Sequence, residues 1–281
     1  TSIAVGSDFE EQMSTVQAIS MSADSDMARL NDRAKELGKS TKFSATEVGQ
    51  GFEYMAMAGW KTEDMLDGIS GVLNLAAASG EDLGEVSDIV TDVMTAFGLG
   101  AEQAGHFADI LAIASSNSNT NVSMMGETFK YVAPVAGALG YKIEDAAVAI
   151  GLMANSGIKA SQAGTSLRAM LSRLAGPTKE VKGAMDALNL SMTDEDGNVK
   201  SFLKLTQDIR AGFSGMSEVQ QSEIASKLAG QEAMSGLLAI ANASEEDFNK
   251  LTEAINDSTG AAEKMAEIRL DNLKGDITIL R

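Results

Sequence analysis

The sequence TKFSATEVGQGFEYMAMAGWKTEDML, residues 41–66, has the pattern of one helix, a glycine break and the start of a second helix. Ser44 followed three residues later by Glu47 forms a capping-box pattern, which favours a helix start at this point. Gly59 can adopt the left-handed conformation that ends many helices. Thr62 is a candidate N-cap for the helix that follows. This stretch therefore predicts a helical hairpin.

The aromatic and glycine residues of this hairpin occur a second time along the chain. A Phe-x-Tyr pair is repeated 77 residues later (129 − 52), and a glycine–aromatic pair is repeated 81 residues later (140 − 59). The two offsets differ by about one helical turn, so we expect a second, related hairpin that is one turn longer. The residues that define the repeat are Phe52, Tyr54, Gly59 and Trp60 in the first copy and Phe129, Tyr131, Gly140 and Tyr141 in the second.

Trp60 and Tyr141 occupy equivalent positions, directly after the glycine that ends a predicted helix. Two interpretations are open for these aromatic side chains. Each could pack the loop onto the following helix, as a hydrophobic staple does. Alternatively, each could be exposed as part of a surface that binds a partner protein.

A heptad pattern precedes the first hairpin, over residues 7–37. Apolar or small side chains recur there at alternating steps of four and three residues. Ser7 with Glu10 is a candidate capping box and Gly38 a candidate stop, so one long helix is expected. This helix either lies across its own domain or forms a coiled coil with other copies. The candidate oligomer seam consists of Phe9, Met13, Val16, Met27, Leu30 and Leu37.

The remaining chain also predicts helices. From residue 44 to 176, a glycine or a polar run interrupts helical apolar stripes about every 20 residues. Helices with one apolar face and short links stack as antiparallel hairpins, either in an irregular bundle or in a short solenoid. Asp196-Gly197 predicts a tight turn within residues 191–199 that could close a tiny hairpin. Helices are expected again after this turn, the last beginning near Ala261.

We therefore predict an all-α fold of stacked antiparallel helical hairpins, preceded by a long heptad helix. The expected segments are the heptad helix at 1–40, a helical-hairpin core at 41–176 and a C-terminal helical subdomain at 177–281, with a boundary at Gly176-Pro177. Because the chain begins without methionine, we expect it to be a segment of a longer protein.

Composition excludes several classes of function. A net charge of −18 argues against sequence-independent nucleic-acid binding and against adsorption to anionic membranes. No stretch reaches the roughly 18 apolar residues of a membrane span. The chain has no cysteine and a single histidine, His106, so no thiolate nucleophile and no H-E-x-x-H metal site is available. We predict no catalytic residue, no metal ligand and no cofactor.

Two short motifs resemble ligand sites without completing them. The Gly-Lys-Ser sequence at 38–40 lacks the glycine of a phosphate-binding loop, since Arg33 occupies that position. The acidic turn at 194–198 would place Met192 and Leu203 where a calcium loop needs oxygen ligands. A plain turn is the better interpretation of this segment.

A longer, ordered set of motifs resembles the core region of phage tail tape measure proteins. The resemblance runs from about residue 9 to the end and is strongest over residues 42–174. The motifs, in order, are F-S-A-x-E at 43–47, G-W-x-x-E-D at 59–64, A-F-G at 96–98, the Ser/Asn-rich joint at 115–121, G-x-x-x-E-D-A at 140–146 and N-S-G-I-K-A-S-Q-A-G-T-S-L-R at 155–168.

The resemblance implies a structural protein and not an enzyme. Such proteins lie in the lumen of the virion tail, set tail length during assembly in the bacterial host cytoplasm, and leave ahead of DNA at infection. It implies self-association, as a trimer or hexamer, and contacts with the tail tube protein, tail-tip or baseplate proteins and tail assembly chaperones. Sequence-specific nucleic-acid binding is not implied, and membrane contact is expected only at infection. The alternative is a membrane-active or cell-wall-penetrating helical domain that assists DNA delivery.

Overall fold

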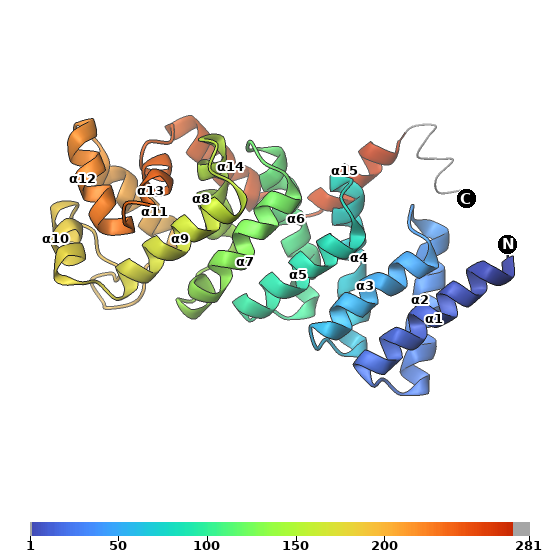
Figure 1. The fold of residues 1–281 in the computed structure, drawn as a ribbon. Helices are drawn as coiled ribbons and strands as arrows, with labels where there is room; N and C mark the ends of the chain where they lie inside the picture. The colour runs from blue at the N-terminus through green and yellow to red at the C-terminus, as the bar shows by residue number, and fades with distance from the viewer. Residues whose placement is uncertain (1, 272–281) are drawn as a thin grey trace. The chain divides into compact units, whose positions relative to one another are not determined.

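The computed structural model describes residues 2–271, and helices joined by loops make up this part of the chain (Figure 1). It confirms the predicted all-α class. The described residues form two compact units. Unit 1 contains the chain up to Ala112 and the segment that starts at Ser258, and unit 2 runs from Ile113 to Asp257.

Unit 1 is built around α3, which packs against α1, α2 and α5. The returning helix α15 packs against α4 in the same unit. The helices that lie wholly in this unit are α1 (Ser2–Ser20), α2 (Asp24–Ser40), α3 (Ala45–Met57), α4 (Thr62–Ser79), α5 (Leu83–Phe97), the short 3-10 helix η1 (Ala101–Gln103) and α15 (Ala261–Leu270). The next helix, α6, spans Ala104–Ser116.

The expectation of one continuous helix over residues 7–37 is wrong. α1 ends at Ser20, α2 begins at Asp24, and Met21 between them has a left-handed φ of +52°. Ser7 is also not a cap, because α1 is helical from Ser2. No glycine or proline stands between α1 and α2. The cause is tertiary, since the break lets α1 and α2 each pack on α3.

The first hairpin begins as predicted. The Ser44 N–H donates to Glu47 Oε2 at 2.7 Å, and the Glu47 N–H donates to Ser44 Oγ at 3.2 Å, which completes the capping box. The expectation of a Thr62 cap is wrong by one residue. Lys61 is the N-cap of α4, and its N–H donates to Asp64 Oδ2 at 3.0 Å. Thr62 is instead buried in the first turn.

Unit 2 contains the second hairpin and the C-terminal helices. α7 packs against α9, and α8 packs against α11, α13 and α14. Phe129, Phe202 and Phe213 are among its largest fully buried side chains. The helices that lie wholly in this unit are α7 (Val122–Ala138), α8 (Ile143–Asn155), α9 (Ala160–Ala175), α10 (Lys179–Ala187), α11 (Phe202–Phe213), α12 (Glu218–Ala229), α13 (Met234–Ala241) and α14 (Glu245–Asn256).

The tight turn predicted within residues 191–199 is present. Gly197 has a φ of +85°, and an isolated antiparallel bridge joins Thr193 to Val199. The Asp194 carboxylate accepts the N–H groups of Asp196 and Asn198 at 3.0 and 2.9 Å. This acid therefore stabilises its own turn, in agreement with the plain-turn interpretation.

The division into segments at residues 40 and 176 stays a prediction, and the two compact units have other bounds. Helices on both sides of Gly176-Pro177, such as α9 and α12, contact each other in unit 2. The last described helix, α15, belongs to unit 1.

Candidate functional site

In both copies of the repeated hairpin, the first helix ends in the same way. Gly59 and Gly140 have φ values of +83° and +72°. In each copy the glycine N–H donates to the carbonyl three residues earlier, and the N–H of Trp60 or Tyr141 donates to the carbonyl five residues earlier, at 2.9–3.0 Å. This is the Schellman arrangement, in which the left-handed residue is most often glycine.

The two aromatic residues after these glycines pack inside their own units. Trp60 is half-buried, and its indole lies over Gly68 so closely that a Cβ added there would be 2.4 Å from the ring. Tyr141 is 5% exposed and stacks on Phe202, with ring centroids 5.1 Å apart and an interplanar angle of 17°. Both contacts fit the packing interpretation better than an exposed binding surface.

The repeat includes a third helix, because the tyrosine of each Phe-x-Tyr pair lies close to a glycine on the helix that follows the hairpin. A Cβ added to Gly84 on α5 would lie 3.1 Å from the Tyr54 ring, and one added to Gly164 on α9 would lie 2.4 Å from Tyr131 Cβ. Helix α5 thus approaches α3 as α9 approaches α7. The sequence interpretation missed this relation, although the two glycines are 80 residues apart (164 − 84), close to the offsets of the hairpin.

The two copies differ at their shared acidic position. Asp64 accepts the N–H of Lys61 and so caps its own helix. Asp145 is 9% exposed and accepts the N–H of Leu203 at 2.9 Å, at the start of α11. Burial raises the pKa of Asp145, and the hydrogen bond from Leu203 opposes that shift. The second copy therefore binds the following part of unit 2.

The predicted oligomer seam lies within unit 1. Met13, Val16, Met27, Leu30 and Leu37 are at most 7% exposed. Phe9, the remaining seam residue, is half-buried. In this state the seam residues supply the core of unit 1, and their role in self-association stays a prediction.

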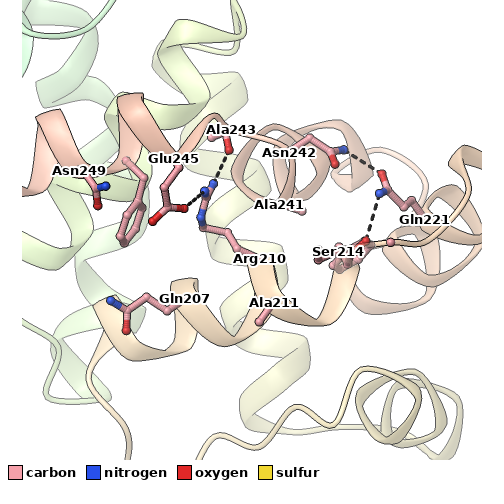
Figure 2. A pocket seen from close by; sticks show the side chains of 13 residues that line it. Gln207, Arg210, Ala211, Ser214, Gln221, Ala241, Asn242, Ala243, Glu245 and Asn249 are labelled. Atoms are coloured by element: carbon pink, nitrogen blue, oxygen red, sulfur yellow. Dashed lines mark hydrogen bonds and ion pairs between the residues drawn. The ribbon is translucent and has the colours of Figure 1, made fainter.

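A polar pocket of about 620 Å³ lies among α11, α13 and α14 in unit 2 (Figure 2). Figure 2 shows Arg210 between Ala243 and Glu245. Its guanidinium donates to Ala243 O at 2.7 Å, Ile240 O at 3.2 Å and Glu245 Oε2 at 3.1 Å, and it lies 4.9 Å from the centre of the Phe248 ring. Carbonyl groups at a helix end need such donors. Arg210 therefore has a structural role at the end of α13.

Chemistry-bearing groups are dispersed over the described residues. No set of three or more His, Cys, Asp or Glu side chains within 2–271 is placed to hold a metal ion. Among the described helices, none combines the length and apolar character that crossing a membrane requires. The contacts described above are those of helix packing and helix capping within each unit.

The sequence of this chain is similar to that of phage tail proteins. The family model for phage-related minor tail proteins matches residues 31–230. The chain belongs to this family. This family member is 42% identical over 276 residues to the tape measure protein of Pneumococcus phage Dp-1, covering 98% of the chain and 24% of that relative. It is 30% identical over 276 residues to the probable tape measure protein of Escherichia phage P2, covering 96% of the chain and 34% of that relative.

The resemblance to tape measure proteins drawn from the motifs is thereby confirmed. The family member described here spans about a quarter to a third of the length of these two curated relatives. No solved structure matches the chain.

Proposed function

We propose that this chain is a folded domain of a tape measure protein, which sets tail length during assembly and leaves the tail ahead of DNA at infection. The observation that carries the proposal is the 42% identity to a protein named as a tape measure protein, along 98% of this chain. An assembly role also agrees with the dispersed titratable groups, and we propose no enzymatic activity and no cofactor.

Within such a protein, we assign this segment to the folded part and not to the measuring part. The longest described helix, α1, has 19 residues, which corresponds to about 28 Å. The two hairpins fold back at Gly59 and Gly140. A ruler needs extended helix, so the measuring length would lie mainly outside this domain.

We further propose that the protein lies in the lumen of the virion tail, after assembly in the bacterial host cytoplasm. Its partners would be further copies of itself, as a trimer or hexamer, the tail tube protein, tail-tip or baseplate proteins and tail assembly chaperones. The net charge of −18 supports this placement. An acidic chain repels DNA phosphates, so the two would not bind each other during ejection.

The alternative, a membrane-active or cell-wall-penetrating domain, has no feature of the described residues in its favour. We therefore do not retain it as the proposed function.

In-frame deletions in the complete protein, followed by electron microscopy of the tails, test the proposal. Removing n residues from an extended helical region should shorten tails by about 1.5 Å for each residue removed. Removing the same number of residues from unit 2, for example α12 and α13, should not shorten tails in proportion. Unchanged tail lengths for every deletion would contradict a tape measure role.

A further inference from the structure

The joint between α1 and α2 interrupts a heptad pattern that keeps its phase on both sides. From Val16 to Met27 the seam positions step by four, three and four residues, through Ser20 and Ala23. The joint, residues 21–23, has the sequence Met-Ser-Ala, with no glycine or proline. Since these three residue types are all tolerated in helices, local sequence does not require the break.

The joint is strained at Met21. Met21 has a φ of +52° and is 87% exposed, so a side chain with a Cβ occupies the left-handed region without burial to offset the steric cost. Most hydrogen bonds of the joint are local: the Met21 N–H donates to Gln17 O at 2.8 Å, the Ser22 N–H donates to Ser20 Oγ at 3.3 Å, and Ala23 O accepts N–H groups from the first turn of α2. Ser22 Oγ also lies 3.3 Å from Thr62 Oγ1 on α4. A continuous helix would remove the strain at Met21.

The folded-back pair also has a cleft beside Phe9, the one seam residue that is only half-buried. A cleft of about 520 Å³ lies between α1 and α2, lined in part by Phe9, Met13 and Met27. Asn31 also lines the cleft, and its Oδ1 is buried with no hydrogen-bond partner. An unpaired buried acceptor disfavours this arrangement.

We propose that this joint is a hinge. α1 and α2 can leave α3 and join into one helix over residues 2–40, about 58 Å long. The heptad seam, which is buried in unit 1 in the described state, then packs against a second copy of this chain in a parallel coiled coil. This inference rests on the proposed function, in which several copies share one tail, and it adds the conformational change that makes the seam available.

The charge pattern beside the seam permits this pairing. With Phe9 at heptad position d and Met13 at position a, each g residue faces the following e residue of a parallel partner. No such pair carries like charges, although the whole chain has 40 acidic and 22 basic residues. The pairs are Val5–Glu10, Gln12–Gln17, Ile19–Asp24, Asp26–Asn31 and Arg33–Gly38.

Spin labels on α1 and α2 of the full chain distinguish the two states. The chain has no cysteine, so cysteines at the exposed positions Asp8 and Asp32 can be labelled selectively. Lys35 Nζ lies 5.5 Å from the Phe9 ring, so these ends of α1 and α2 are neighbours in the described state. One continuous helix would place residues 8 and 32 about 36 Å apart. We expect a population at this longer distance that grows with protein concentration, together with self-association by light scattering.

Substitutions at the joint supply the decisive comparison. Met21→Gly removes the steric cost of the left-handed joint and lowers helix propensity, so the long-distance population should fall about 30-fold. Met21→Ala keeps a Cβ and should behave like the wild type. Ala28→Gly, at an exposed site that is helical in both states, controls for the glycine itself and should leave the ratio unchanged.

Two results would overturn the hinge. One is the absence of the long distance in the wild type and in Met21→Ala at every concentration. The other is a long-distance population that does not respond to Met21→Gly, or that forms without self-association. Tail-length measurements on deletion variants are independent of these distances, so failure of the hinge and failure of the tape measure role can be told apart.

Discussion

The carboxylate of Asp109 accepts the backbone N–H of Gly260 at 2.8 Å, across 151 residues of chain. Its other oxygen accepts the N–H of Ala262 at 2.9 Å. Asp109 thus serves as a capping group for α15, whose own N-cap, Gly260, has no side chain to do so. Arg269 strengthens the same attachment, since a Cβ added to Gly80 would collide with its guanidinium. Both ends of α15, the last described helix, therefore contact other helices of unit 1.

Replacing the distant cap should loosen α15. We expect Asp109→Ala to lower the free energy of unfolding by about 1–2 kcal/mol, the usual cost of losing an N-cap acceptor. Hydrogen exchange should accelerate in α15 more than in α3. Asp67→Ala, at an exposed position on α4, removes one carboxylate from unit 1 and should have little effect. Equal effects of the two substitutions would argue against the capping role.

The close approach of α9 to α7 predicts a strong effect of a single methyl group. Gly164→Ala would place a Cβ 2.4 Å from Tyr131 Cβ, and we expect a loss of about 1–3 kcal/mol from overpacking. Gly183→Ala on α10 meets no atom within 4 Å, so it should stabilise the chain by up to about 1 kcal/mol. Urea unfolding of both variants measures the contrast, and a harmless Gly164→Ala would contradict this packing.

Asp145 should give a pH-dependent difference between variants. Its pKa is raised by burial, so the folded state disfavours ionisation, and the stability linked to this group falls as pH rises from the ordinary aspartate pKa to the raised value. Asp145→Asn keeps an oxygen acceptor for the Leu203 N–H but cannot ionise. We expect the variant's free energy of unfolding, minus that of the wild type, to rise over this pH range and then stay constant.

Urea unfolding of both proteins from about pH 3.5 to pH 7 measures this difference. Asp145→Ala serves as a control, because it removes both the ionisable group and the acceptor, so its free energy of unfolding should lie about 1–3 kcal/mol below that of Asp145→Asn at every pH. A difference between the asparagine variant and the wild type that declines with rising pH would contradict the assignment.

Tyr141 combines a favourable ring contact with an unsatisfied hydroxyl. Its Oη is buried without a hydrogen-bond partner, and burial raises its pKa to about 12. Tyr141→Phe keeps the stacking on Phe202 and should be neutral or stabilising by about 1 kcal/mol, because an unpaired buried polar group is removed. Tyr141→Leu loses the aromatic pair and should destabilise. Thermal unfolding separates these outcomes, and a marked loss in the phenylalanine variant would indicate a role for the hydroxyl.

Local features of this chain were predictable because their physical causes are local. The Ser44–Glu47 capping box, the tight turn at Asp196-Gly197 and the left-handed glycines at 59 and 140 all depend on residues within one or two helical turns. The repeated hairpin was visible for the same reason. The third helix of the repeat was not predicted, because one glycine in each copy, Gly84 or Gly164, is all that marks it in the sequence. Glycine is common in this chain, so a single one does not stand out.

Sequence by itself determined that the chain is helical, that α3 begins after Ser44, that a glycine ends the first helix of each hairpin, and which family the ordered motifs resemble. Tertiary structure alone decided that the heptad helix breaks at Met21, that Asp64 caps its own helix while Asp145 binds α11, and that α15 returns to α4. The reason is that periodicity and caps are set by neighbours along the chain. By contrast, the burial of an apolar face or a carboxylate depends on which distant helix reaches it.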